Sequence, residues 1–237
     1  MKNKSTNIAF KLFALLILIH FSFALNAQTI KKNRQVPSFN GVEVGGAFHV
    51  EIKQGNTSSL SIEAEEDLHD DIETKVSGGI LRIYMDWPKF KWDRHEKIHV
   101  YIQVKELEHL DVSGAGHIKS TNTIVSEHLD LDISGAGHLD LDLETGMLQV
   151  EVSGAGDTNL EGKAVEQNVV LNGAGVYDAS DLSSERITIK SSGAGSASVR
   201  ASEAIEAKAT GASNIRYYGD PEKVMVNSSG AGSISKK

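Results

Sequence analysis

Residues 129–143 read LDLDISGAGHLDLDL, in which the tetrapeptide Ser-Gly-Ala-Gly separates two runs of alternating apolar and polar residues. Side chains that alternate with a period of two belong to a strand with one buried face and one exposed face. The small residues between the two runs allow the backbone to turn sharply. This stretch therefore predicts two half-buried strands that are joined by a corner of small residues.

The tetrapeptide recurs through the second half of the chain. Its copies begin at Ser113, Ser134, Ser153, Asn172, Ser192, Thr210 and Ser229, at spacings of 21, 19, 19, 20, 18 and 19 residues. A propeller blade needs about 40 residues, and an antiparallel meander needs a tight hairpin turn in every repeat. Coils that stack in parallel at ~4.8 Å satisfy both the spacing and the single apolar face. The repeat predicts an all-β protein with a parallel β-solenoid of about seven coils over residues 113–237.

Residues 36–112 contain strand patterns such as 47–52 and 98–104 but show no repeat of this length. No Pro- or Ser-rich linker separates them from residues 113–237. We therefore expect an N-terminal β layer that covers the first coil and is contiguous with the solenoid. Residues 28–35 are expected to form a flexible N-terminus.

The first 27 residues have the layout of a secretory signal peptide. Lys2, Lys4 and Lys11 accompany an apolar run from Leu12 to Leu25. This run is shorter than the ~20 residues that cross a bilayer as a helix, so we expect no transmembrane segment after cleavage. The chain has no cysteine, so no disulfide accompanies export. The expected location is the periplasm, the outer-membrane surface or the extracellular space.

The charge of the chain limits its partners. Without the three lysines of residues 1–27, 21 basic residues remain against 32 acidic ones, a net charge of −11. An acidic surface repels phosphate backbones, which argues against nucleic acid. Glycans, other proteins and cations remain as partners, and the sequence does not define the oligomeric state.

A set of residues before the repeat points to a known family. These residues are Phe39, Val42, Val44, Gly46, Phe48, Val50, Ile52 and Gly55, and they lead into the strands and the repeated corners. In this pattern the chain resembles the head GIN domain family, which is described as auto-transporter adhesins and is common among Bacteroidetes. The resemblance covers about residues 36–235. It implies a right-handed β-helix-like fold and an envelope or extracellular location, and it brings no catalytic residues.

Two rows of side chains are candidate metal ligands. Asp111, Asp132 and Glu151 each precede a corner by two residues, so stacking would align them, and a Ca²⁺ ion would relieve their repulsion. The alternative is a row of carboxylates that water screens without any cation. His117 and His138 share one repeat position, so they could bind Zn²⁺ or form a pH-sensitive row. The alternative is an ordinary surface ladder without metal.

Both tryptophans of the chain fall within residues 87–92, which read WPKFKW. Trp87, Phe90 and Trp92 could stack on sugar rings or anchor a partner protein. The alternative is that they fold back as a lid over the first coil.

Motifs of common enzyme classes are missing from the sequence. It contains no nucleotide-binding glycine motif, no cysteine and no Gly-x-Ser-x-Gly motif. Its uniform repeats also leave no room for the long loops that would form a substrate cleft. We therefore expect a non-enzymatic adhesin or surface-binding and assembly module without a cofactor. A polysaccharide-binding or polysaccharide-active β-helix protein is the alternative, and a scaffold that polymerises end to end is a third option.

Overall fold

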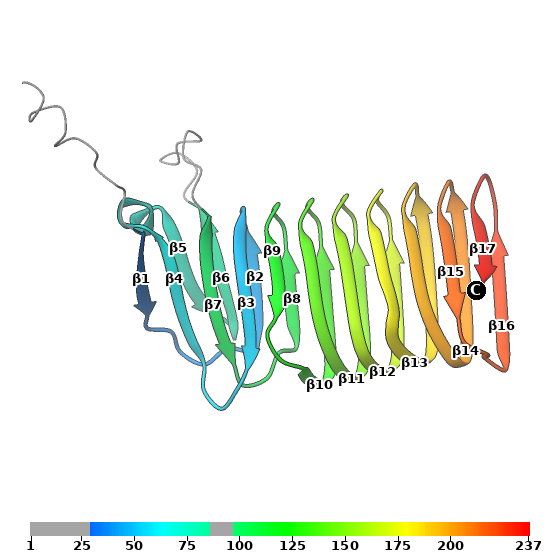
Figure 1. Ribbon diagram of the computed structural model, residues 1–237, viewed down its shortest axis with the longest axis horizontal. Coiled ribbons are helices and arrows are strands. Elements are labelled where there is room, and N and C mark those ends of the chain that lie inside the picture. The colour runs from blue at the N-terminus through cyan, green and yellow to red at the C-terminus, as the bar shows by residue number, and fades with distance from the viewer. Residues whose placement is uncertain (1–28, 86–96) are drawn as a thin grey trace, which may run out of the picture.

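The computed structural model describes residues 29–85 and 97–237. Over these residues the chain is almost entirely β-strand, with one short 3₁₀ helix, η2 (Glu66–Asp70). All strands join one continuous sheet that coils around an elongated core (Figure 1). The described part of the chain has no helix of the length and hydrophobicity needed to span a membrane. The prediction of an all-β protein is confirmed.

The repeat region forms the solenoid. Its strands are β8 (His109–Val112), β9 (His117–Ser120), β10 (Ile124–Ile133), β11 (His138–Val152), β12 (Asp157–Leu171), β13 (Val176–Gly193), β14 (Ser196–Gly211), β15 (Asn214–Tyr218), β16 (Lys223–Ser228) and β17 (Ser233–Lys236). Every pairing among them is parallel. Leu131, for example, pairs with Val150, and Val150 pairs with Val169. The prediction of a parallel β-solenoid of about seven turns is therefore confirmed.

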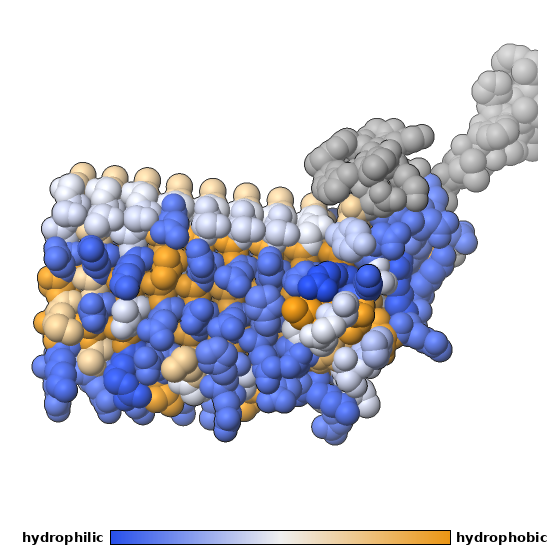
Figure 2. Space-filling view, turned by 180° about the vertical axis from the view of Figure 1, so that it is seen from behind, coloured by the Kyte–Doolittle hydropathy of each residue, from blue (hydrophilic) through white to orange (hydrophobic). Residues whose placement is uncertain are grey.

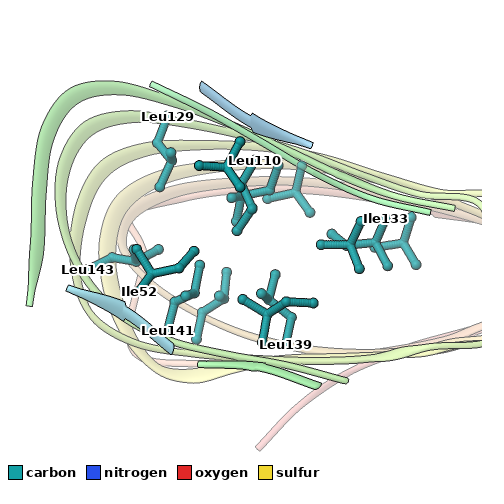
Figure 3. Packing of buried hydrophobic residues seen from close by; sticks show 14 of the residues in the cluster. Ile52, Leu110, Leu129, Ile133, Leu139, Leu141 and Leu143 are labelled. Atoms are coloured by element: carbon teal, nitrogen blue, oxygen red, sulfur yellow. The ribbon is translucent and has the colours of Figure 1, made fainter. Parts of the chain in front are cut away.

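Each coil contributes two walls that enclose the core. The first wall consists of strand residues before the corner, and the second wall consists of those after it. In Figure 3, Leu110 and Leu129 of the first wall lie across the interior from Leu139 and Leu141 of the second. All four side chains are buried, whereas Asp130 and Asp140, which alternate with such residues along the strands, are partly exposed. Polar side chains therefore form rows on the outer face of each wall.

The parallel stack begins earlier in the chain than the repeat. The N-terminal strands are β1 (Thr29–Arg34), β2 (Gly41–Gly45), β3 (Phe48–Gln54), β4 (Ser59–Glu65), β5 (Ile72–Ser77), β6 (Ile80–Met85) and β7 (Ile98–Val104). β2 and β3 pair in parallel with β8 and β9, and β6 and β7 pair in parallel with β2 and β3. These four strands add two coils. The antiparallel strands β1, β4 and β5, together with η2, close the end of the stack (Figure 1).

One expectation about the N-terminus is wrong. Residues 29–34 were expected to be flexible but form β1, which pairs with β4. The guanidinium of Arg34 donates hydrogen bonds to the backbone oxygens of Ile72 and His69, each at 2.7 Å. These bonds fix the end of β1 against β5 and η2.

The corners are built by close approach of one backbone to the next. A Cβ atom on Gly135 would lie 1.8 Å from the carbonyl oxygen of Gly114, so no larger residue fits. The backbone N–H of Ala136 donates to that same oxygen at 3.0 Å. The Ala136 side chain is exposed. The corners form the pale row of small residues along the top edge in Figure 2.

The C-terminal end of the stack differs from the N-terminal end. Val224, Met225 and Val226 of β16 are 45%, 62% and 50% exposed. Among the described strands, β16 has its register with β14 and β17 has its register with β15, so neither has a partner on its outer edge. The solenoid is therefore closed at one end and open at the other.

Candidate functional site

Four histidines stack on consecutive coils of the second wall, and we call them the histidine ladder. They are His99 on β7, His49 on β3, His117 on β9 and His138 on β11, and they pair in register. Neighbouring ring centroids are 5.4, 6.1 and 5.0 Å apart in this order. The ladder exists because each histidine occupies the same outward position in its coil.

Sequence reasoning found only half of the ladder. His117 and His138 were aligned by the repeat, whereas His49 and His99 lie where no repeat is visible. One signal could have revealed His49. It follows residues 45–48, Gly-Gly-Ala-Phe, as His117 follows the first Ser-Gly-Ala-Gly, and Ala115 N–H donates to Gly46 O at 3.1 Å. Residues 45–48 are therefore an additional corner whose last glycine is replaced by Phe48.

Asp140 lies beside two members of the ladder. Its Oδ2 atom is 3.5 Å from Nε2 of His117 and 3.2 Å from Nε2 of His138. All three side chains are partly exposed, at 37%, 43% and 37% for His117, His138 and Asp140. Over residues 29–85 and 97–237, these three form the one group of at least three potential metal-ligand side chains with mutually close donor atoms, all within 4.8 Å of one another. We call this group the His-His-Asp triad.

Charged groups surround the other half of the ladder. His49, His99 and His117 line a hollow of about 320 Å³ together with Lys97 and Lys119. Burial lowers the pKa of His49, and the nearby Lys97, His99 and His117 lower it further. His49 is therefore harder to protonate than an isolated imidazole.

The predicted acidic row is present on the first wall. Asp111 pairs with Asp132 and Asp132 pairs with Glu151, and Glu43 extends the row by one coil. Burial raises the pKa of Asp111, with smaller contributions from Asp132 and Glu43. These carboxylates therefore repel one another, as stacking predicts.

Basic groups compensate the acidic row. The Nε atom of Arg82 lies 2.6 Å from Oε2 of Glu43 at one end. Beyond Glu151 and Val170 the row continues with Lys190 and Lys208. His109 adds a weaker contact, with its Nδ1 atom 4.0 Å from Asp132 Oδ2. Among the described residues, the carboxylates of this row do not form a group of three with oxygen atoms close enough to share one metal ion.

The third predicted site cannot be placed. Trp87, Phe90 and Trp92 lie in residues 86–96, outside the described residues. The chain enters this segment from the end of β6 at Met85 and continues into β7 at Ile98. The aromatic candidates therefore connect the two strands of one coil.

A groove that sequence reasoning missed runs along the edge opposite the corners. It has a volume of about 690 Å³ and is lined by the looser turns of several coils, including Val125, Glu127, Glu144, Val165 and Glu185. Val125 and Val165 are 52% and 40% exposed. Uniform repeats hide such a groove, because it arises from short turns of similar length that lie side by side.

Comparisons with known proteins agree with the fold. Residues 38–221 match the family described as "Putative auto-transporter adhesin, head GIN domain". No curated protein matches the chain. A crystal structure of a "putative adhesin" from Bacteroides fragilis is 25% identical, with a TM-score of 0.83, and the match covers 89% of this chain and 97% of that one.

Two further crystal structures share the fold at lower identity. A "putative lipid binding protein" from Parabacteroides distasonis is 21% identical, with a TM-score of 0.70 and coverage of 90% of this chain and 98% of that one. A "putative adhesin" from Parabacteroides merdae is 20% identical, with a TM-score of 0.65 and coverage of 90% and 97%. The family match spans well over half of the chain, so this protein belongs to the head GIN domain family of adhesin-like surface proteins.

Proposed function

We propose that this protein is an exported, non-enzymatic adhesin that binds glycans or other proteins through the outer surface of its solenoid. The observation that carries this proposal is the family match over residues 38–221, together with the similarity of almost the whole fold to an adhesin-type structure. Export is supported by the signal-peptide layout of residues 1–27. The periplasm, the outer-membrane surface and the extracellular space are all consistent with it.

The repeated coils of the solenoid suit the binding of a long, extended partner. Apolar side chains pack the space between the walls (Figure 3), so polar and charged groups act from the outside. Equivalent outward positions recur on each coil at ~4.8 Å. A partner with its own repeat, such as a glycan chain, can therefore contact several coils at once, and each added contact gains from the effective concentration of the others.

Trp87, Phe90 and Trp92 are the proposed contact points for a sugar or partner protein. Aromatic rings stack on the apolar faces of sugars and form the energetic centres of many interfaces. Their segment connects β6 to β7. β6 and β7 belong to one of the coils that the N-terminal strands add to the solenoid.

A glycan array probed with the purified protein tests this proposal. We expect the protein to bind and the Trp87→Ala/Trp92→Ala double variant to lose binding. Tyr84→Ala is the matched control, because Tyr84 is an aromatic residue of the adjacent strand β6 and is 42% exposed. Binding that survives the double substitution would remove the aromatic segment from the proposal.

The acidic groove favours one alternative, a polysaccharide-active protein. Glu127, Glu144 and Glu185 line the groove, and pairs of carboxylates cleave glycosidic bonds in many enzymes. Incubating the protein with each bound glycan and measuring released sugars separates the two functions. Release that disappears in Glu144→Gln would replace the adhesin proposal, whereas binding without release supports it.

A further inference from the structure

We propose that the His-His-Asp triad, formed by His117, His138 and Asp140, binds a divalent transition-metal ion such as Zn²⁺. This site is independent of the proposed adhesin function. The inference rests on the distances between the three donor atoms, on the rigidity of the strands that hold them and on the chemistry of the donor set.

The distances suit a tetrahedral ion. Zn²⁺ binds nitrogen and oxygen donors at ~2.0–2.1 Å, which places the donors of a tetrahedral site ~3.3 Å apart. Asp140 Oδ2 lies 3.5 Å from His117 Nε2 and 3.2 Å from His138 Nε2. All donor atoms of the triad lie within 4.8 Å of one another. Modest side-chain rotation therefore brings the triad around one ion, without movement of the backbone.

The scaffold holds the ligands in this arrangement. His117 on β9 and His138 on β11 are paired in register, and Asp140 follows His138 by two residues on the same face. The backbone N–H of His138 also donates to Gly116 O at 2.9 Å. Ligands on neighbouring strands of a continuous sheet are better ordered than ligands on loops, which lowers the entropic cost of binding.

The charged side chains next to the triad leave its donor atoms accessible to a metal ion. Lys119, which pairs with Asp140 across the strands, has its Nζ atom 3.1 Å from Oε1 of Glu51. The ammonium group of Lys119 is therefore paired with Glu51 on the adjacent coil. Asp157 follows His138 in the same row and adds negative charge beside the site. The triad therefore has an added carboxylate, Asp157, on one side and a lysine that is already paired with Glu51 on the other.

The donor set selects the class of metal. Two imidazole nitrogens and one carboxylate oxygen suit Zn²⁺, Ni²⁺ or Cu²⁺, whereas Ca²⁺ and Mg²⁺ require a shell of oxygen atoms. The three side chains are 37–43% exposed. The remaining coordination positions are therefore open to water or to a donor from another molecule.

The same geometry has a metal-free interpretation, in which both imidazole N–H groups donate to one carboxylate oxygen. The two interpretations predict different behaviour for Asp140→Asn. An asparagine oxygen still accepts hydrogen bonds, but a neutral amide is a much poorer zinc ligand than a carboxylate. This variant should therefore keep the fold and lose the metal.

Isothermal titration calorimetry with Zn²⁺ on the untagged protein tests the proposal. We expect one site per chain, and a loss of affinity in Asp140→Asn and in His138→Ala larger than the ~10–100-fold that removal of an outer-shell partner costs. His128→Ala is the matched control, because His128 Nε2 lies 2.9 Å from Asp130 Oδ1 in a pair without a second histidine. His99→Ala is a second control from the ladder itself. Both controls should bind as the wild type does, and Ca²⁺ should not compete.

A second measurement identifies the ligands directly. Zinc should change the NMR chemical shifts of the imidazole rings of His117 and His138 and leave those of His128 unchanged. Absence of Zn²⁺ binding, binding that Asp140→Asn leaves unchanged, or an equal loss in His128→Ala would each overturn the proposal. Circular dichroism of every variant shows whether a loss of binding reflects unfolding, and a well-folded Asp140→Asn variant that still binds zinc would show that the ion is held without this carboxylate.

Discussion

The substitution Gly135→Ala tests how the corners hold the solenoid together. A Cβ atom at this position would lie 1.8 Å from the carbonyl oxygen of Gly114, whereas real Cβ contacts are essentially never shorter than 3.0 Å. The two coils would have to separate locally by about 1.2 Å, the difference of these distances. The obstructing atom belongs to the backbone, so no side chain can rotate to make room.

The magnitude follows from two costs. Forced overpacking typically costs ~1–3 kcal/mol. The hydrogen bond from Ala136 N–H to Gly114 O, now 3.0 Å long, would also be lost, at a cost of ~1 kcal/mol. The free energy of unfolding should therefore fall by about 2–4 kcal/mol. In a domain of this size ~1 kcal/mol shifts Tm by ~2–4 °C, so we expect Tm to fall by roughly 5–15 °C.

Thermal unfolding followed by circular dichroism measures this change, and two controls isolate its cause. Ala136→Ser alters the exposed neighbour and should stay within ~0.5 kcal/mol of the wild type. Gly78→Ala replaces a glycine that has a φ of +62° and no atom within 4 Å of the new Cβ, so it reports backbone strain without a clash. A Gly135→Ala protein that melts with the wild type, or no lower than Gly78→Ala, would refute the close-approach explanation.

Two further predictions concern the core and the acidic row. Tyr177→Phe removes the buried hydroxyl that donates to Gln167 Oε1 at 2.9 Å, so urea denaturation should show a loss of ~1–3 kcal/mol; an unchanged midpoint would contradict this. Asp111→Asn should raise Tm near neutral pH, because the raised pKa of Asp111 means that its ionised form destabilises the native state. As pH falls, the native wild-type protein takes up this proton before the unfolded chain does, so the gain should shrink, and a gain that stays constant down to about pH 3 would contradict the reasoning.

The repeat predicts the solenoid well because its signal is local. Each Ser-Gly-Ala-Gly copy lies within one coil, and the alternation beside it assigns the inner and outer faces. This is enough to place Asp111, Asp132 and Glu151 in one row and His117 and His138 in another, as the structure shows.

The N-terminal coils escape this reasoning because neighbours in space are not neighbours in the chain. β3 pairs with β9, but β4 to β8 lie between them in the sequence, and β7 stacks on the far side of β3. No fixed period can reveal such an order, so His99 could not be aligned with His117, and only the likeness of residues 45–48 to a corner could have aligned His49. The groove lined by Glu127, Glu144 and Glu185 was missed for a related reason, because it forms only when the turns of several coils are stacked side by side.

The chemistry of the corner was also only partly predictable. Glycine in a turn usually indicates a positive φ, yet among the corner glycines only Gly46, Gly193, Gly211 and Gly230 have one. At Gly135 the requirement comes from the neighbouring coil, whose carbonyl occupies the space of a side chain. A single sequence does not contain that information until the coils are stacked.

Folding alone does not explain the histidine ladder. The row that contains His138 continues on later coils with Asp157, Val176, Ser196 and Asn214. The solenoid thus accommodates an acidic, apolar or small polar residue at this outward position. Stacking of the coils therefore does not require histidine at this position on four coils in succession, nor a carboxylate beside two of the four. The zinc titration therefore addresses the part of the surface that the architecture leaves free.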